Sequence, residues 1–505
     1  MSTRRRGAPA RLQTAARALR THRFRAAAAT VVLALSSVLV PGATPASAAD
    51  GGALTSAVST ALVPLSLPVL TRVGPSAQDR LVSITEQDGS AKPRLSVRWD
   101  TLTPLQDRPV SVTGSAPVPS NGASRWVYLE EWIVEDGVWT YVKDTRTDAA
   151  GAFALELTLH RVNEPRRFRI VVDKGPGTPA VTSPSVTLRA VWQPDSPTTK
   201  TYPGLSVTWP GTRVLVGSRQ SIQGTLVTRP TRGVATVQRL VAERWTDVVS
   251  SPVTGAGSFT LSLPTAYLTH ATYRVRITDA RGEVATTPGE SFVVVPDYTP
   301  DGREDSYVLV SPAPVGRWNP CAPIRYRLNL AKAPAGVLPD VQAALEQVSQ
   351  ATGLRFEYQG TTSVVPFLAG DTFDPAVADL VIAWADPAQM HGLFPAGTLG
   401  VGGPEFRTAL ATDPAGRPVR QIYQGGVTIN TAFNKALRPG SGEGLTRVAA
   451  LMHEIGHAVG LMHVDRDDAQ LMSPAIGYGL DQWGAGDLAG LETVGAAGGC
   501  LTPGA

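Results

Sequence analysis

Two histidines four residues apart, His453 and His457, have the spacing in this chain that points most directly to chemistry. On a helix this spacing places both imidazoles on one face, one turn apart, where they can bind a single metal ion. Glu454 lies between them, and Gly460 permits a turn that ends the helix, so that His463 can return to supply a third nitrogen. Three protein ligands leave one coordination position open, as in catalytic rather than structural zinc sites.

Glu454 supplies the second half of the expected chemistry. Its side chain cannot point in the same direction as its histidine neighbours, so it is left beside the open position as a general base and later proton donor. Zinc lowers the pKa of a bound water to about 7. The pattern HExxH alone also occurs in ordinary amphipathic helices. The longer match HExxHxxGxxH, in a chain with 7 histidines among 505 residues, favours a hydrolytic zinc site.

Three aspartates shortly after His463 leave two alternatives open. Asp465, Asp467 or Asp468 could replace the third histidine as a ligand, but His463 matches the required spacing. Together the aspartates are typical of a solvated loop. A Ca²⁺ site is the alternative, although no calcium-binding motif supports it.

The stretch 451–474, LMHEIGHAVGLMHVDRDDAQLMSP, resembles the metzincin zinc-peptidases, and most closely their matrixin branch. The resemblance implies that the three histidines bind one catalytic Zn²⁺ and that Glu454 is the catalytic acid and base. Met472 stands where metzincins place the methionine of a tight turn below the ligands. The resemblance therefore implies a supporting role for Met472.

Other residues are assigned by the same resemblance. The segment 483–494 is similar to the C-terminal helix of matrixins, in which Asp487 would support the site. Pro474 and Tyr478, just past the methionine turn, would form the wall of the pocket for the residue after the scissile bond.

The elements expected around these residues give an α+β domain over 303–505. Apolar residues recur at helical spacing, which predicts one buried face for the helix that carries the histidines: Leu445, Val448, Ala449, Met452 and Ile455. Before it the pattern predicts a strand at 324–330, a helix opened by Pro339 and closed by Gly353, and strands at 354–358 and 379–384.

The stretch 399–403 occupies the position of the family's edge strand, with which an extended substrate pairs. Gly400 and Val401 are therefore candidate substrate-pocket residues. The glycines of this stretch fit a loop equally well.

Cys321 and Cys500 lie near the two ends of this domain. Export permits a disulfide between them, which would stabilise the domain by about 4 kcal/mol through the unfolded state. Two unpaired thiols are the alternative.

The first 48 residues are expected to be a signal peptide. Eight arginines and no acidic residue accompany an apolar run at 26–40, and Ala46-Ser47-Ala48 offers a cleavage site. Removing them lowers Lys+Arg from 46 to 38 (46 − 8) against 42 Asp+Glu, so the net charge changes from +4 to −4 (38 − 42). The basic balance therefore argues for no nucleic-acid partner, and no later segment has the length of a membrane span. Residues 49–78 are expected to be a linker or a propeptide-like segment.

The region between the leader and the zinc motif has the pattern of two all-β domains, at 79–193 and 203–297. Sequence features of the first return in the second: Phe153, for example, recurs as Phe259, 106 residues later (259 − 153). A duplicated module of this size resembles the immunoglobulin-like β-sandwich repeats of exported bacterial proteins. Such domains would act as spacers, as wall-associating modules or in positioning a substrate.

Four tryptophans of this region suggest contact with cell wall or polysaccharide, although burial in the sandwich cores is the expectation that we favour. They are Trp126, Trp132, Trp139 and Trp245.

The sequence thus predicts a multidomain exported protein in which two all-β Ig-like sandwiches precede an α+β metzincin-type zincin domain. Its expected activity is that of a secreted zinc endopeptidase acting on protein or peptide substrates. One alternative is an adhesion or wall-binding protein whose zinc site is vestigial. The other is a zinc hydrolase of peptidoglycan amide bonds.

Overall fold

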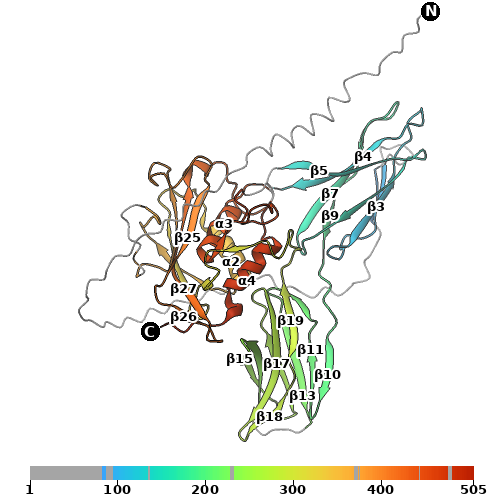
Figure 1. Ribbon diagram of the computed structural model, residues 1–505. Helices are drawn as coiled ribbons and strands as arrows, with labels where there is room; N and C mark the ends of the chain where they lie inside the picture. Colours follow the sequence, from blue (N-terminus) through green and yellow to red (C-terminus); the bar gives the residue numbers. More distant parts are fainter. Residues whose placement is uncertain are drawn as a thin grey trace, which may run out of the picture.

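The computed structural model of the chain describes residues 82–86, 95–134, 137–227, 233–368, 374, 376–442, 444–475 and 480–504. Three lobes follow one another along the chain (Figure 1). The predicted signal peptide 1–48, the segment 49–78 and Tyr478 lie outside the described residues. Within the described parts no helix has the length and apolar character needed to span a membrane.

The first lobe consists of two antiparallel sheets. One has the order β1-β2-β3-β6, and the other has the order β5-β4-β7-β8 with β9 also on β7. The strands are β1 (Val82–Glu86), β2 (Leu95–Trp99), β3 (Pro109–Ser115), β4 (Trp126–Ile133), β5 (Val138–Arg146), β6 (Ala152–Thr158), β7 (Pro165–Val172), β8 (Val181–Thr182) and β9 (Val186–Arg189).

The second lobe repeats this arrangement, except that β12 pairs parallel with β19. Sheet β10-β11-β13-β16 is accompanied by sheet β12-β19-β17-β14-β15, with β18 on β17. The strands are β10 (Thr198–Tyr202), β11 (Leu205–Trp209), β12 (Arg213–Leu215), β13 (Gln220–Leu226), β14 (Val234–Val241), β15 (Arg244–Pro252), β16 (Ser258–Leu263), β17 (Thr269–Asp279), β18 (Gly282–Thr286) and β19 (Glu290–Val295). The expectation of mostly β architecture before the zinc motif is confirmed.

Strict alternation of side chains explains which tryptophans form the sandwich cores. Trp99 ends β2 and Trp209 ends β11, and both are buried with the inward residues of their strands. Trp126 begins β4 and points outward, with 39% of its surface exposed. Trp132, Trp139 and Trp245 are only half-buried. The expectation that these four form the cores is wrong. Trp126 and Trp132 alternate with the inward residues of β4, whereas Trp139 and Trp245 lie on β5 and β15, strands without a buried residue.

The third lobe is built on a mixed sheet. Strands β23, β22, β24 and β27 are parallel neighbours in that order, while β25 and β26 pair antiparallel with β27 and β21 pairs parallel with it. Its strands are β21 (Gly316–Arg317), β22 (Ile324–Asn329), β23 (Phe356–Thr361), β24 (Leu380–Ala385), β25 (Gly400–Phe406), β26 (Ala411–Thr412) and β27 (Pro418–Asn430). A separate pair joins β20 (Val308–Leu309) to β28 (Leu461–Met462).

Helices cover one face of this sheet: α2 (Leu338–Thr352), α3 (Arg447–Val459) and α4 (Ala485–Val494), with the short helices η1 (Thr431–Phe433) and η2 (Ala496–Gly498). Helix α2 has Pro339 in its first turn and ends at Gly353, where φ is 73°, as the sequence predicts. Strand β24 is buried along its whole length, because Ile382 and Trp384 face the helices while Ala383 and Ala385 face a second apolar cluster.

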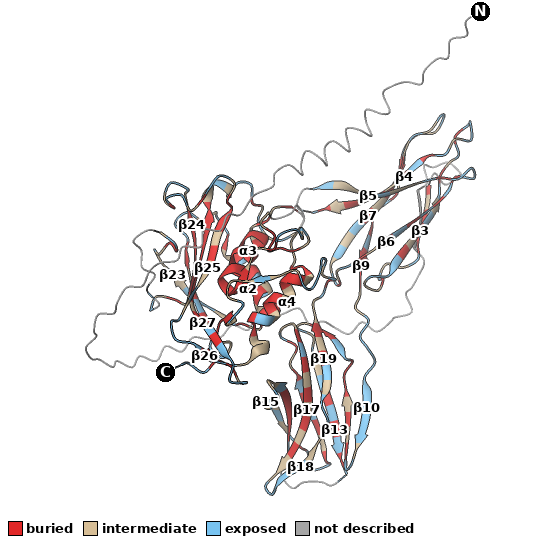
Figure 2. Ribbon diagram, viewed as in Figure 1, coloured by how far each residue is buried: buried red, intermediate tan, exposed pale blue. Residues whose placement is uncertain are grey.

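Helix α3 is buried more completely than the sequence predicts. Thr446 caps its first turn by accepting a hydrogen bond from the Ala449 N–H, and every residue from Val448 to Val459 is buried. Figure 2 shows the helix buried in the centre of the lobe. The expectation of a single buried face is too narrow, because α3 contacts strands β25 and β27 as well as helices α2 and α4.

The sandwiches are joined to the third lobe by specific contacts. In the first sandwich, one guanidinium nitrogen of Arg161 donates hydrogen bonds to both carboxylate oxygens of Asp481, each at 3.1 Å. In the second sandwich the backbone N–H of His270 donates to the Glu492 carboxylate of α4. Tyr298, which follows that sandwich, donates its hydroxyl proton to the backbone oxygen of Trp483. The β domains are therefore held against the helical face of the third lobe.

Cys321 and Cys500 form a disulfide that joins the beginning and end of the third lobe across 179 residues, which confirms the predicted pairing. We expect Cys321→Ser combined with Cys500→Ser to lower the free energy of unfolding of this lobe by about 4 kcal/mol, because the unfolded chain regains loop entropy. Urea denaturation followed by tryptophan fluorescence measures the change, and reduced unmodified protein is the control. An unchanged urea midpoint would contradict this expectation.

Candidate metal centre

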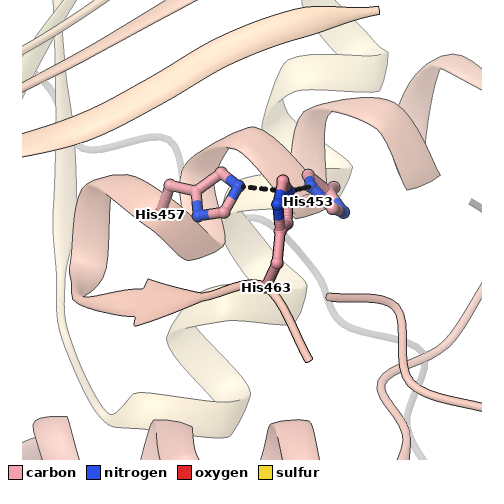
Figure 3. A group of neighbouring side chains, drawn as sticks. All are labelled: His453, His457 and His463. Carbon is pink, nitrogen blue, oxygen red and sulfur yellow. Dashed lines mark hydrogen bonds between the residues drawn. The ribbon is translucent and has the colours of Figure 1, made fainter. Parts of the chain in front are cut away.

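His453, His457 and His463 bring three ring nitrogens together at the end of helix α3. The Nε2 atom of His463 lies 3.1 Å from the Nε2 of His453 and 3.1 Å from that of His457. Figure 3 shows the three rings turned toward a common point, two from the helix and one from the segment that follows β28. Across the described residues this is the one histidine, cysteine or carboxylate group arranged to hold a metal ion.

The hydrogen bonds on the far side of two rings fix where their protons lie. The Nδ1 of His453 donates to the Leu471 carbonyl, and the Nδ1 of His457 donates to the Leu461 carbonyl, because a carbonyl can only accept. In the neutral rings both Nε2 atoms are therefore unprotonated. If His463 carries its proton on Nε2, that proton can be donated to only one of the other two Nε2 atoms. At the remaining Nε2–Nε2 contact two lone pairs face each other and repel. A cation among the three nitrogens removes that repulsion.

Burial keeps these rings neutral. It lowers the pKa of His457 to about 3 and that of His463 to about 4, with Asp465 acting against the shift at His463. Burial, followed by the neighbouring His457 and His463, also holds the pKa of His453 well below its ordinary range. Near neutral pH all three imidazoles therefore carry free lone pairs, as metal ligation requires.

Glu454 lies under the first residues of strand β25. A Cβ on Gly400 would come within 2.7 Å of its Oε1. The residue is 1% exposed, and Oε1 accepts no hydrogen bond from the residues that the structure describes. Burial raises the pKa of Glu454 to about 8. Burying a carboxyl oxygen without a hydrogen-bond partner costs free energy. Oε1 of Glu454 is therefore suited to accept a proton from a water or a substrate.

The expected supporting residues lie directly behind the histidines. Met472 is buried, and its sulfur occupies the space beside Gly456, where a Cβ would lie only 2.6 Å from Sδ. The ring of Trp483 reaches the same glycine. Sequence reasoning did not single out Gly456 or Trp483, because a small residue inside a helix reveals its purpose only when its neighbours are known.

Asp487 holds the methionine turn in place. Its carboxylate accepts hydrogen bonds from the backbone N–H groups of Leu471, Met472 and Gly484. Burial raises its pKa to about 7, against the opposing effect of these bonds. Leu471 is also the residue whose carbonyl orients His453, so Asp487 supports the orientation of His453 through one intermediate residue.

Gln470 is a supporting residue that the sequence analysis missed. Its side chain is fully buried, accepts a hydrogen bond from the Asp487 N–H and donates one to Asp467. Asp467 also accepts hydrogen bonds from the backbone of Arg303 and Ala469, so it serves this turn. The only sequence signal for this role is a glutamine two residues before Met472, and HExxHxxGxxH does not include that position.

The turn after α3 differs slightly from the expected one. Gly460 has φ 121° and ψ 8°, outside the left-handed helical region but still a conformation that favours glycine. Leu461 and Met462 then pair with β20, which fixes the Leu461 carbonyl that orients His457.

The predicted substrate residues have different positions. The stretch around Gly400 is strand β25 rather than a loop, and its outer edge has no partner among the described strands. Gly400 faces Glu454, but the side chain of Val401 packs on the opposite face of the sheet and does not line this space. Pro474 is half-buried just after the methionine turn. Tyr478 lies outside the described residues.

No protein-family model matches the chain, and no curated protein matches it either. Among solved structures, a tetra-tandem repeat from the extending region of a large adhesion protein is 14% identical, with a TM-score of 0.15 over 40% of this chain and 49% of that chain. A Ca²⁺-stabilized adhesin with which an Antarctic bacterium binds ice is 16% identical, with a TM-score of 0.15 over 38% and 45%. The D0-D1 domain of intimin is 13% identical, with a TM-score of 0.15 over 42% and 99%.

The chain therefore spans about half the length of the first two of these structures. At TM-scores of 0.15 the likeness supports no statement about the fold or function of this chain.

The contact between β25 and α3 gives a sharp prediction. A Cβ on Gly402 would lie 2.1 Å from the backbone oxygen of Glu454, whereas the nearest atom to a Cβ on Gly403 is 3.8 Å away, in Phe367. We expect Gly402→Ala to push α3 from the strand and lower the free energy of unfolding by about 3 kcal/mol. Gly403→Ala is the matched control, with an expected change of less than about 1 kcal/mol. Urea denaturation of both variants tests this, and equal effects would contradict the close packing.

Proposed function

We propose that this chain is a zinc-dependent endopeptidase of the metzincin type, similar to the matrixins. The observation that carries the proposal is the convergence of three imidazole Nε2 atoms, those of His453 and His457 unprotonated, beside buried Glu454, whose Oε1 has no partner among the described residues. The pattern HExxHxxGxxH predicts this set from the sequence alone.

The donor set suits zinc in chemistry and in spacing. Three neutral imidazoles with a vacant fourth position are a common catalytic zinc set. Zn–N bonds of about 2.0–2.1 Å in a tetrahedral arrangement separate the nitrogens by about 3.3 Å. The two Nε2 separations of 3.1 Å at His463 are close to that value. His453, His457 and His463 would hold the ion.

Each step of hydrolysis assigns a task to a residue of this chain. Bound zinc would polarise the peptide carbonyl and acidify water. Glu454 would accept the proton of the attacking water at Oε1, the atom without a partner, and then deliver it to the nitrogen of the leaving amine. A zinc ion held by the three histidines would favour the carboxylate form of Glu454 against the effect of burial, which raises its pKa to about 8, so Glu454 would act as a base at neutral pH.

A peptide is the substrate best suited to the surroundings of Glu454. Strand β25 runs along the site with its outer edge unpaired by any described strand, and Gly400 and Gly402 lie against Glu454. An extended peptide can add to such an edge as a further strand through backbone hydrogen bonds. That pairing would bring a backbone carbonyl of the substrate near the glutamate.

Two alternatives remain as predictions. In the first, the chain is an exported adhesion or wall-binding protein whose zinc site is vestigial, and in this case residues 300–505 add no proteolysis. In the second, the same zinc chemistry acts on peptidoglycan amide bonds.

Substitution of the glutamate tests the assignment of roles. We expect Glu454→Gln to retain one zinc per chain and to lose casein hydrolysis by about 10²- to 10⁴-fold, because the proton acceptor is lost while the ligands remain. His457→Ala should lose both zinc and activity. His391→Ala is the control, since His391 is exposed and belongs to no described metal group. Full activity of Glu454→Gln would refute the mechanism.

A substrate comparison separates the peptidase from its alternatives. The exported chain is assayed on casein and on peptidoglycan sacculi, with and without 1,10-phenanthroline. We expect casein cleavage that the chelator abolishes and added zinc restores. Release from sacculi alone would favour the amide hydrolase, and no cleavage of either substrate by the zinc-loaded chain would favour the adhesion alternative.

A further inference from the structure

The duplication of the β-sandwich allows the outer faces of two equivalent hairpins to be compared position by position. In β4–β5 the pairing register shifts between Leu129 and Glu130, and in β14–β15 it shifts between Val237 and Gln238. Because both hairpins are irregular at the same place, Trp132 paired with Trp139 corresponds to Leu240 paired with Trp245.

One aromatic stack is common to both copies. The guanidinium of Arg169 lies 4.2 Å from the ring centre of Trp139, and that of Arg274 lies 4.3 Å from the ring centre of Trp245. Since the stack occurs in both sandwiches, we attribute it to the stability of the sheet.

The other aromatic residues on this face occur only in the first sandwich. We call the set Trp126, Tyr128, Trp132, Trp139 and Tyr141 the aromatic face; all point outward from β4 and β5. In the second sandwich, four of these positions hold Val234, Thr236, Leu240 and Asp247. The sandwich fold therefore forms without aromatic side chains at these four positions. Their presence in the first sandwich has a reason other than stability of the fold.

The aromatic face is accessible and ordered by its own contacts. Trp126 is 39% exposed and the guanidinium of Arg146 lies 4.1 Å from its ring centre, while Trp132 and Trp139 meet edge to face at 5.4 Å. Tyr128 and Tyr141 meet in the same way at 6.4 Å. Among the described elements, the principal neighbours of β4 and β5 are strands of the same sandwich, β6 and β7.

The charges that accompany the aromatic face indicate an uncharged, hydrogen-bonding ligand. Arg146 and Arg167 stand where the second sandwich has Pro252 and Thr272, and these two positions add positive charge.

Acidic residues are added at the same time. Glu130 and Asp144 stand where the second sandwich has Gln238 and Ser250. Each sign is also lost once, because Val171 stands where the second sandwich has Arg276 and Tyr141 stands where it has Asp247. Within β4, β5 and β7 each sign therefore increases by one (2 − 1), so the face gains donors and acceptors without gaining net charge. A mixture of donors and acceptors suits a ligand with hydroxyl groups. A polyanion would instead be matched by a surface with an excess of positive charge.

We propose that the aromatic face of the first sandwich binds an uncharged polysaccharide. The apolar faces of successive sugar rings would pack on Trp126, Tyr128 and Trp132, while ring hydroxyls bond to the neighbouring arginines and carboxylates. A row of partly exposed rings along one strand fits an extended polymer, whereas protein hot spots are typically enclosed in desolvated pockets. The inference does not rest on the proposed peptidase activity.

The test replaces three aromatic residues with those that the second sandwich carries at the same positions. The full chain and its variant Trp126→Val/Tyr128→Thr/Trp132→Leu are passed over chitin beads, cellulose and heparin resin. We expect retention of the unmodified chain on chitin or cellulose but not on heparin, and at least tenfold weaker retention of the variant. Val234→Ala/Leu240→Ala, at the equivalent positions of the second sandwich, should bind like the unmodified chain.

Folding and self-association are measured on the same samples. Thermal unfolding compares the variants with the unmodified chain. If the triple variant is destabilised, the single variant Trp126→Val, at the most exposed ring, replaces it and should weaken retention at least threefold. Absence of retention on both neutral polymers, equal retention of the variants, or retention on heparin alone would overturn the proposal. A dimer in sedimentation velocity that the triple variant dissociates would also overturn it, because the face would then join two copies of this chain.

Discussion

Burial of three neutral imidazoles whose Nε2 atoms converge, with at least one pair of lone pairs facing each other, is the constraint on which the third lobe depends. Two of the rings are fixed by carbonyls, those of Leu471 and Leu461, so they cannot turn to relieve the repulsion at His463. Such an arrangement costs free energy unless a cation occupies the space between the nitrogens. The surrounding structure maintains it through contacts from four separate parts of the chain.

Those contacts make the site a property of the whole lobe. Asp487 in α4 holds the turn that carries Leu471, and β20 pairs with the segment that carries Leu461. Strand β25 approaches α3 so closely that Gly402 tolerates no side chain. The segment after the second sandwich reaches the same region through Tyr298, whose hydroxyl donates a hydrogen bond to the backbone oxygen of Trp483 beside the methionine turn. The orientation of the histidines therefore depends on residues far away in the sequence.

The sequence predicted those features that follow from local spacing. The pair His453 and His457, the end of α2 at Gly353 and the buried strand β24 all rest on periodicity or on the conformation of one glycine. From the sequence the glycines of β25 fitted a strand and a loop equally well. Glycine is required there because the strand packs against Glu454, which lies 52 residues after Gly402 in the chain (454 − 402).

The same limit explains the tryptophans. Trp99 and Trp126 both belong to strands rich in apolar residues, and only the register of each strand decides which side chain enters the core. Gln470 likewise acquires its role through Asp487 and Asp467, which it meets only in the folded chain.

The most direct test of the metal centre is X-ray absorption spectroscopy of the zinc-loaded full chain. We expect three imidazole nitrogens and one further light atom around each zinc, with Zn–N distances of about 2.0–2.1 Å. Loss of one imidazole shell in His463→Ala would assign the third ligand. A spectrum of the unmodified chain with fewer than three imidazoles, or with none, would contradict the central claim.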